Sequence, residues 1–249
     1  MTEFRSDMGV ELVDYMGSDE RIARAARVSS GADPSAPYEG LVRKLIQSDP
    51  PHTSPFEHCV LTVRVEIPKR VAWEWMRHRT QSYSELSTRY AEMDPVFFAP
   101  PKDRPIMQVG KPMDYRRKLA DPETYRRVTR DRIALAEYAM GLYREQLDQG
   151  VAREVAAEVL PPYFYTAFYA TANLNNWFKF LYLRTDPTAL WEIQEAGAKV
   201  EEIIAKLWPI AYGAWKDDIE EHRRARAAAP AEPKVDQVTE LTLIPGGAS

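Results

Sequence analysis

The sequence predicts an α+β fold, in which a small, mostly antiparallel sheet is joined to a bundle of helices. Residues 61–67 alternate between apolar and polar side chains, which is the period of a half-buried strand. After residue 122 the apolar residues recur at helical spacing instead. A chain of 249 residues with 45% hydrophobic content is large enough to bury one core. We therefore expect a single domain over residues 1–221 and a disordered tail over 222–249.

The first half of the chain mixes short strands and short helices. Residues 9–17 favour a strand that ends at Gly17, and Ser18 is placed to cap the next helix. Pro68 suits the first position of a helix that runs to Arg77. The other segments predicted here are a loop at 31–37, a helix at 38–47, a loop or irregular strand at 80–90 and a long, proline-rich surface loop at 94–122.

The second half is predicted to be helical throughout. A long helix spans 122–149 and ends before Gly150, and a shorter one spans 151–160. The aromatic-rich segment 163–183 is predicted as a third helix, and a fourth begins with Asp186 as its cap. That last helix carries a stripe of core residues at steps of three and four, namely Leu190, Ile193, Gly197, Val200, Ile204 and Leu207.

Composition narrows the possible functions. The net charge of −4 and the pI of about 5.7 argue against a general nucleic-acid binder. Cys59 is the only cysteine, so no disulfide can form within one chain, which suits a reducing cytoplasm. The sequence shows neither a signal peptide nor a run of 18 apolar residues. No zinc-ligand spacing joins the histidines, so we expect no metal site. Because the apolar run that a membrane span needs is missing, we expect no membrane partner.

The segment Arg77–Tyr90, RHRTQSYSELSTRY, concentrates polar chemistry. Guanidinium groups of Arg77, Arg79 and Arg89 suit phosphate oxygens and uracil carbonyls, because both accept paired hydrogen bonds in a plane. Hydroxyl groups between them could complete a phosphate-binding loop. From these residues alone a second interpretation stays open, since basic residues at the end of a helix often only offset its dipole.

The order Arg-His-Arg, seven residues, then Ser resembles the signature of flavin-dependent thymidylate synthases. It stands here as Arg77-His78-Arg79, TQSYSEL and Ser87. Further similar segments are ELVDYMGSDERIARAARVS near the start, HTSPFEH at 52–58, and REVAAEVLP, NLNNWFKFLYLR and ALWEIQEAGAKV in the second half. The resemblance covers roughly residues 9–210, apart from the loop at 94–122.

This resemblance implies a function and a set of ligands. It implies a homotetramer whose sites lie between subunits, and which binds FAD, a deoxyuridine nucleotide and methylenetetrahydrofolate, with NADPH as reductant. The residues expected to hold FAD are His52, Ser54, Arg77, His78, Arg79, Glu85 and Asn173. The residues expected to hold the nucleotide are Arg77, Glu85, Leu86, Ser87, Thr88, Arg89 and Arg184.

The resemblance gives Arg184 the catalytic role of favouring the uracil anion. A guanidinium against the imide edge would push electron density toward the weakly nucleophilic carbon 5. Cys59 enters an apolar strand and is interpreted as packing rather than catalysis. Ser87 has no recognisable base beside it in sequence, so a binding role is favoured. Most of the aromatic residues in 163–178 are interpreted as core.

Several positions of the expected ligand shell depart from the family pattern. Glu74 stands where Gln is usual, Ala157 and Asn175 stand where Arg is usual, Lys179 replaces Asn or His, and Ser84 replaces the commoner Asn. The changes at 74 and 157 should weaken the hold on a phosphate, unless Lys179 or Arg153 compensates.

These departures suggest a specialised relative that methylates UMP instead of, or as well as, dUMP, with Glu74 near the ribose 2′-hydroxyl. In this the chain resembles a family member that acts in polyoxin-type nucleoside antibiotic biosynthesis. The alternatives are a nucleotide-dependent flavin oxidase, or a sensor of nucleotide or flavin that carries out no turnover. No G-x-S-x-G motif supports a serine hydrolase.

Overall fold

The centre of the molecule is a four-stranded antiparallel sheet in the order β2-β3-β8-β4. We describe residues 2–90, 92–111 and 114–228 of a computed structural model. The strands are β2 (Gly9–Met16), β3 (Val60–Pro68), β8 (Tyr165–Asn173) and β4 (Ser82–Glu85). The predicted alternation of β3 is confirmed, because Leu61, Val63, Val65 and Ile67 are fully buried while the residues between them face the other side of the sheet.

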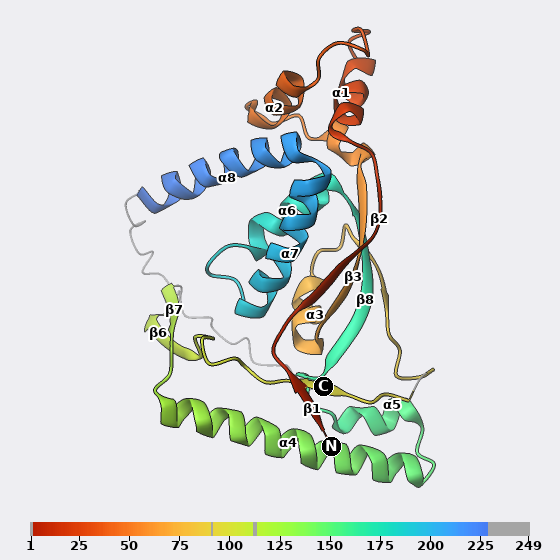
Figure 1. Ribbon diagram of the computed structural model, residues 1–249, viewed down its shortest axis with the longest axis vertical. Coiled ribbons are helices and arrows are strands. Elements are labelled where there is room, and N and C mark those ends of the chain that lie inside the picture. The colour runs from red at the N-terminus through yellow and green to blue at the C-terminus, as the bar shows by residue number, and fades with distance from the viewer. Residues whose placement is uncertain (1, 91, 112–113, 229–249) are drawn as a thin grey trace, which may run out of the picture.

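Helices cover only one face of this sheet (Figure 1). The helices against that face are α3 (Lys69–Trp75), α6 (Leu174–Arg184) and α7 (Trp191–Leu207). At one end of the sheet lie α1 (Asp19–Val28), α2 (Glu39–Gln47), the 3-10 helix η1 (Ser54–His58) and α8 (Pro209–Ala228). Ser18 caps α1 as predicted, since its hydroxyl accepts the Arg21 N–H.

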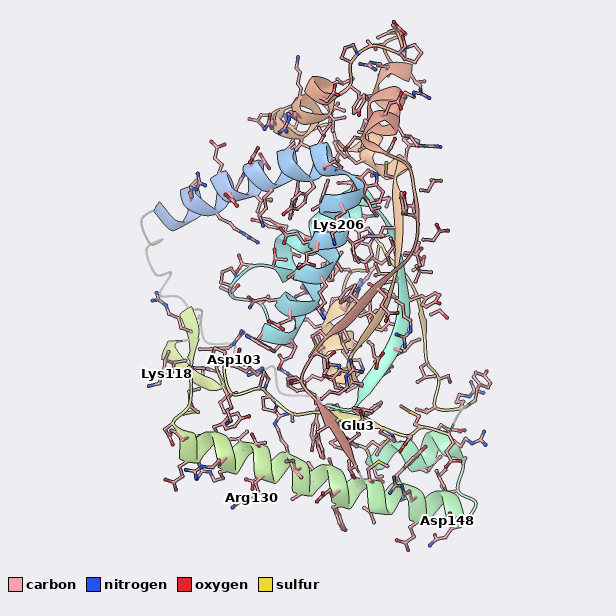
Figure 2. All side chains as sticks on the ribbon, viewed as in Figure 1. Glu3, Asp103, Lys118, Arg130, Asp148 and Lys206 are labelled. Carbon is pink, nitrogen blue, oxygen red and sulfur yellow. The ribbon has the colours of Figure 1, made fainter. Side chains whose placement is uncertain are left out.

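The opposite end of the molecule is closed by α4 (Pro122–Asp148), which Asp121 caps. Arg130 and Asp148 lie on this helix (Figure 2). The remaining elements near it are β1 (Glu3–Arg5), β5 (Val96–Phe98), β6 (Met107–Lys111), β7 (Asp114–Lys118), α5 (Arg153–Ala156) and η2 (Ala157–Val159). The short helix predicted at 151–160 is therefore two shorter turns.

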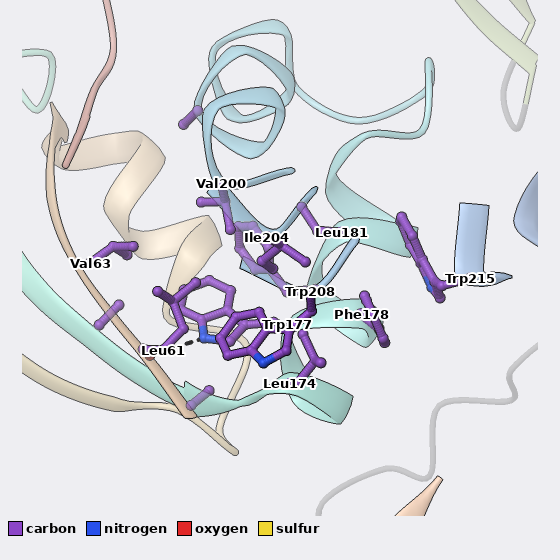
Figure 3. Close-up of a cluster of buried hydrophobic side chains, with 14 of the residues drawn as sticks. Leu61, Val63, Leu174, Trp177, Phe178, Leu181, Val200, Ile204, Trp208 and Trp215 are labelled. Carbon is purple, nitrogen blue, oxygen red and sulfur yellow. Dashed lines mark hydrogen bonds between the residues drawn. The ribbon is translucent and has the colours of Figure 1, made fainter. Parts of the chain in front are cut away.

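The core is built from aromatic and aliphatic side chains where β3, α6 and α7 meet (Figure 3). Trp75, Trp177 and Trp208 are fully buried, and the Trp177 indole N–H donates to the Leu61 carbonyl at 3.1 Å. The predicted stripe on α7 is confirmed for Ile193, Val200 and Ile204, which are inaccessible to solvent. Leu190 and Leu207, at its two ends, are only partly buried.

The helix predicted over 163–183 is wrong for its first half. Residues 165–173 form β8, the strand between β3 and β4, and a helix begins only after Asn173. Phe168, Ala170 and Ala172 are buried whereas Tyr169 is 47% exposed, so the side chains alternate with the period of a strand. The segment is a strand because its backbone forms hydrogen bonds with β3 on one side and β4 on the other, and both strands are distant in sequence.

Four further boundaries differ from prediction. The loop at 94–122 is not confined to the surface, because β5 pairs in parallel with β1 and buries Phe97 and Phe98. Asp186 does not cap α7, which begins after Leu190, but accepts the N–H and hydroxyl of Thr188. The helix predicted from Pro68 ends at Trp75 rather than Arg77. Residues 222–228 continue α8, so the tail is not disordered there, and 229–249 lie outside the described residues.

Within the described ranges, no helix is both long enough and apolar enough to cross a membrane. The same part of the chain holds no group of three or more His, Cys, Asp or Glu residues arranged for a metal ion.

Candidate functional site

Arg184, the last residue of α6, is held by three hydrogen bonds to α3 and the turn that follows it. Its Nε donates to Nε2 of His78 at 2.9 Å. Its Nη1 donates to the Glu74 carboxylate at 2.7 Å, and its Nη2 donates to the Glu74 carbonyl at 3.2 Å. The Arg184 side chain is 16% exposed. The guanidinium group is therefore fixed in orientation, and two of its five N–H groups remain for a ligand.

His78 is set up to be neutral. Burial, followed by the positive charge of Arg184, lowers the pKa of His78 to about 4. A neutral ring can offer the lone pair of Nε2 to the Arg184 N–H, which an imidazolium could not. The His78 ring packs edge-on against Phe180, with 4.8 Å between the ring centroids. The His78 backbone is held by Tyr83, whose hydroxyl donates to the His78 carbonyl at 2.9 Å.

Arg77 and Arg79 flank His78 and are exposed. Within the described part of the chain, neither side chain donates a hydrogen bond to the protein. Their guanidinium groups are therefore available to an anionic ligand, although nothing in one chain orients them.

Residues 85–89 line a cleft of about 760 Å³. Glu85 ends β4, and its carboxylate accepts from Lys69 Nζ at 2.6 Å and from the Thr166 hydroxyl at 2.7 Å. The Leu86 N–H donates to the Ala167 carbonyl, which continues the β4–β8 pairing by one residue. This anchoring places the Ser87 and Thr88 hydroxyl groups and Arg89 along the rim of the cleft. The structure thus brings together five of the seven residues expected to hold the nucleotide.

The charges that line this cleft are not those of a strong phosphate site. Lys69 and Arg89 supply two positive charges, whereas Glu85, Glu154 and Glu158 supply three negative ones. Ala157 lies between these last two glutamates and contributes no charge. Neither Lys179 nor Arg153 lines the cleft, so the compensation suggested from the sequence is not found there.

The remaining residues expected to hold FAD lie at the other end of β8. Asn173 pairs with Val60, whereas Glu85 pairs with Phe168, and five residues along a strand span roughly 17 Å. Asn173 caps α6 through its side-chain oxygen; His52 is exposed just before η1, and Ser54, the first residue of η1, is exposed as well. Arg184 and the Arg77–Arg79 segment do not line the cleft at 85–89. One chain therefore does not join the expected residues into a single pocket.

Between α2, α6 and α8 lies a mostly apolar pocket of about 570 Å³. Phe178 and Trp215 stack in parallel on its wall, with ring centroids 5.1 Å apart. Two positions that depart from the family pattern, Asn175 and Lys179, also line it, and Asn175 donates to the Glu57 carboxylate at 3.1 Å. These departures thus change a pocket distinct from the one at 85–89.

Lys69 and Trp73 line the cleft and were missed from the sequence. They are four residues apart on α3, so one face of this helix carries both. The helix was predicted, and its period could have shown that Lys69 and Trp73 share a face. The Lys69–Glu85 contact had no such signal, because it joins residues of different elements.

Cys59 is buried, as predicted. Burial raises the pKa of its thiol to about 11, and the thiol donates to the Ser18 carbonyl at 3.6 Å. A thiol that stays protonated near neutral pH is a poor nucleophile. The structure thus agrees with a packing role. Of the aromatic residues interpreted as core, Phe168, Trp177 and Phe178 are buried, whereas Tyr169 is exposed.

Comparison with known proteins identifies the family. The family model of the thymidylate synthase complementing protein, Thy1, matches residues 11–210. The chain belongs to this family. A flavin-dependent thymidylate synthase of Thermus thermophilus is 38% identical over 212 residues, covering 84% of this chain and 76% of the relative. One from Streptomyces coelicolor is 38% identical over 229 residues, covering 86% and 92%. The chain is accordingly an enzyme, a methyltransferase.

Two solved structures are also similar. They show the UMP/dUMP methylase PolB from Streptomyces cacaoi, one bound with 5-Br UMP and the other with 5-Br dUMP. The first has a TM-score of 0.81 and 38% identity, and covers 87% of this chain and 96% of the methylase. The second has a TM-score of 0.80. This likeness confirms the predicted α+β fold of the family.

Proposed function

We propose that this enzyme transfers a one-carbon unit from methylenetetrahydrofolate to carbon 5 of the uracil of a nucleotide and reduces it to a methyl group. FAD is the cofactor, NADPH is its reductant, and both dUMP and UMP are substrates. The observation that carries the proposal is the fixed guanidinium of Arg184, in a chain of this family.

Arg184 is the proposed catalytic residue. Its two remaining N–H groups suit a carbonyl of uracil and, once the ring is ionised, the deprotonated imide nitrogen beside it. Partial burial strengthens the attraction between the guanidinium and a uracil anion, and this favours the form in which carbon 5 is nucleophilic. The neutral ring of His78 and the carboxylate of Glu74 hold the guanidinium in place while uracil is ionised. Reduced FAD, when bound, supplies the reducing equivalents.

The loop 85–89 is the proposed nucleotide-binding segment, with Arg89 on the phosphate and Glu85 on the sugar or base. Arg77 would reach the same nucleotide. Because acidic side chains outnumber basic ones in this cleft, Arg89 needs further cations to balance a phosphate. A second copy of the chain could bring them, and the exposed Arg77 and Arg79 are suitable donors.

FAD is proposed to bind through His52, Ser54 and Asn173 at one end of β8, and through Arg77, His78, Arg79 and Glu85 along the sheet edge. The donors fit this cofactor: exposed guanidinium groups suit a pyrophosphate, and the amide of Asn173 suits a polar ring edge. Because these groups are separated within one chain, the proposal requires a site shared between subunits.

A homotetramer is proposed for the same reason. The sheet face opposite the helices is open, and Met16 and Tyr169 are exposed on it, whereas Leu12 and Tyr15 are exposed on the helix side of the edge strand β2. Apolar side chains gathered on an open sheet favour contact with another protein surface. We place the enzyme in the cytoplasm, since its single cysteine is a buried free thiol.

The decisive experiment is analysis of the products by mass after incubation with UMP or dUMP, FAD, NADPH and methylenetetrahydrofolate. We expect a mass gain of one methyl group on both nucleotides. A preference for dUMP above a hundredfold would contradict the dual specificity, and no methylated product from either would overturn the proposed function.

A flavin oxidase or sensor on the same scaffold remains the second candidate. The ion pair between Glu74 and Arg184 favours it, because this carboxylate partly neutralises the charge meant for uracil. Release of tritium from carbon 5 of labelled nucleotide distinguishes the two, since only methyl transfer requires that carbon to react. A purified protein that is colourless and takes up no added FAD would favour a nucleotide sensor.

A further inference from the structure

A second, smaller cavity lies between α3, α4 and α7 and borders the cleft at 85–89 at Pro162. Its volume is about 270 Å³, and Pro162 lines both spaces. Three guanidinium groups face this cavity, those of Arg70, Arg104 and Arg132, together with one carboxylate, that of Glu192. The lining therefore carries a net charge of +2, in contrast to the acidic excess of the cleft.

Arg104 is already satisfied. It forms a two-pronged ion pair with Glu192, in which Nε reaches one carboxylate oxygen and Nη2 reaches the other at 3.0 Å. Its Nη1 donates to the Pro105 carbonyl at 3.2 Å. The Glu192 side chain is 3% exposed, so this pair is a buried part of the wall. The hydrogen bonds of this carboxylate are thereby occupied by Arg104, and Glu192 acts on Arg132 only through its charge.

Arg132 and Arg70 are not satisfied within the described residues. The Arg132 guanidinium lies 5.2 Å above the ring of Tyr163, and no described protein atom accepts a hydrogen bond from it. Burial is the largest influence and lowers the pKa of Arg132; the positive charges of Arg104 and Arg70 act in the same direction, whereas Tyr163 and Glu192 oppose them. Arg70 likewise donates no side-chain hydrogen bond to the described chain. Two guanidinium groups that line one cavity, Arg70 exposed to solvent and Arg132 partly buried, are thus free to donate to an anion.

The chemistry that best matches these two guanidinium groups is a dianion with several acceptor oxygens. Two uncommitted guanidinium forks balance two negative charges, and each fork can make paired hydrogen bonds to oxygens of one phosphate. A singly charged carboxylate would leave half of the positive charge unbalanced. Val71 and Phe98 also line the cavity, and their apolar side chains could contact a small carbon group attached to the phosphate. The volume lies below the usual range of pockets for drug-sized ligands, which favours a small phosphate compound.

We propose that this cavity binds a dianionic phosphate, either free or as a small phosphomonoester, held by Arg70 and Arg132. The site is separate from the proposed nucleotide-binding loop, because none of residues 85–89 lines it. Free phosphate and a phosphomonoester share the same recognition chemistry, and they differ only in whether a carbon group contacts Val71 and Phe98.

Calorimetric titration tests the proposal. The ligands are inorganic phosphate and glycerol 3-phosphate, and sodium chloride at equal ionic strength is the control. The variants are Arg70→Gln and Arg132→Gln, and the matched control is Arg130→Gln on the outer side of α4, where Arg130 pairs with Asp131. Each cavity variant should weaken phosphate binding at least tenfold, and the control should not change it. Tighter binding of glycerol 3-phosphate would identify a phosphomonoester as the occupant, and tighter binding of phosphate would identify the free ion.

Arg89→Gln separates this site from the nucleotide site. If the cavity binds phosphate, binding that depends on Arg132 must persist in Arg89→Gln. Loss of all phosphate binding in Arg89→Gln, or unchanged binding in both cavity variants, would overturn the proposal. Neither outcome bears on methyl transfer. Because the Arg70 side chain is exposed and donates no hydrogen bond within the described residues, its variant should fold and remains informative even if Arg132→Gln is unstable.

Discussion

Two groups of arginine side chains in this molecule differ in how their charge is used. Arg184 donates to both His78 and Glu74, so most of its hydrogen-bonding capacity is spent within the chain. Arg70 and Arg132 face a cavity, and neither side chain donates a hydrogen bond within the described residues. An arginine that is held by its neighbours supplies a charge at a fixed place, which suits catalysis. An arginine that is not held supplies affinity, which suits binding.

The same contrast appears within the cavity itself. Arg104 stands beside Arg70 and Arg132, yet its buried pair with Glu192 makes it structural. Proximity of guanidinium groups therefore does not by itself define a site. The partners of each group decide its role, and the following predictions test that distinction.

The largest effect is expected for Arg184→Ala. Loss of the fixed guanidinium should lower kcat for nucleotide methylation by about 10²–10³, with a much smaller change in KM, because the group acts mainly on the charge that develops during reaction. Steady-state rates with UMP and dUMP check this, with Arg130→Ala as a surface control. Methylated product forming at an undiminished rate would remove Arg184 from the mechanism.

The second effect concerns folding rather than activity. Glu192→Gln leaves Arg104 without its counter-charge in a buried place, and the free energy of unfolding should fall by about 3 kcal/mol. Urea denaturation measures it. Asp131→Asn removes a pair that is exposed on both sides and should change stability by less than about 0.5 kcal/mol. If Glu192→Gln and Asp131→Asn changed the free energy of unfolding equally, the Arg104–Glu192 ion pair would not stabilise the folded protein as proposed.

A smaller effect is expected for Glu74→Gln. The amide can still accept from Arg184, but the negative charge is gone, so the guanidinium attracts an anionic ligand more strongly. The nucleotide KM should fall about fivefold, or about 1 kcal/mol. Glu74→Asp keeps the charge and serves as the comparison. If KM rises in Glu74→Gln while Glu74→Asp is unaffected, the carboxylate contacts the substrate itself, as the sequence suggested for the ribose hydroxyl.

The smallest effect is a pH dependence from His78. Its pKa in the folded protein is about 4, below the ordinary value of 6.5, so the unfolded chain binds more protons between these pH values. The stabilisation is complete above pH 6.5 and is lost as the pH falls toward 4. We expect about 1 kcal/mol, because solvent screens a partly exposed ring. The free energy of unfolding is measured at pH 7 and pH 4.5 in the wild type and in His78→Gln, which separates the His78 contribution from that of the carboxylates. An equal loss of stability in both proteins would contradict the prediction.

Local features were predictable from the sequence wherever one segment was sufficient to determine them. The alternation of Leu61–Ile67, the Ser18 cap and the stripe on α7 are all periodic or capping patterns within a few residues. The motif at Arg77–Ser87 indicated the family, which the comparisons confirmed. The roles of individual residues at the site stay predictions, since no ligand contact tests them.

Tertiary structure decided what depends on partners distant in the chain. Residues 165–173 became a strand because β3 and β4 supply hydrogen bonds on both sides, and no local pattern encodes those neighbours. The contact of Arg184 with Glu74 and His78 joins residues more than 100 positions apart. The cavity of Arg70, Arg104 and Arg132 is assembled from segments that meet only after folding. Sequence thus determined which groups are present and their local conformation, whereas the fold determined which of their charges are neutralised, because neutralisation depends on distance in space.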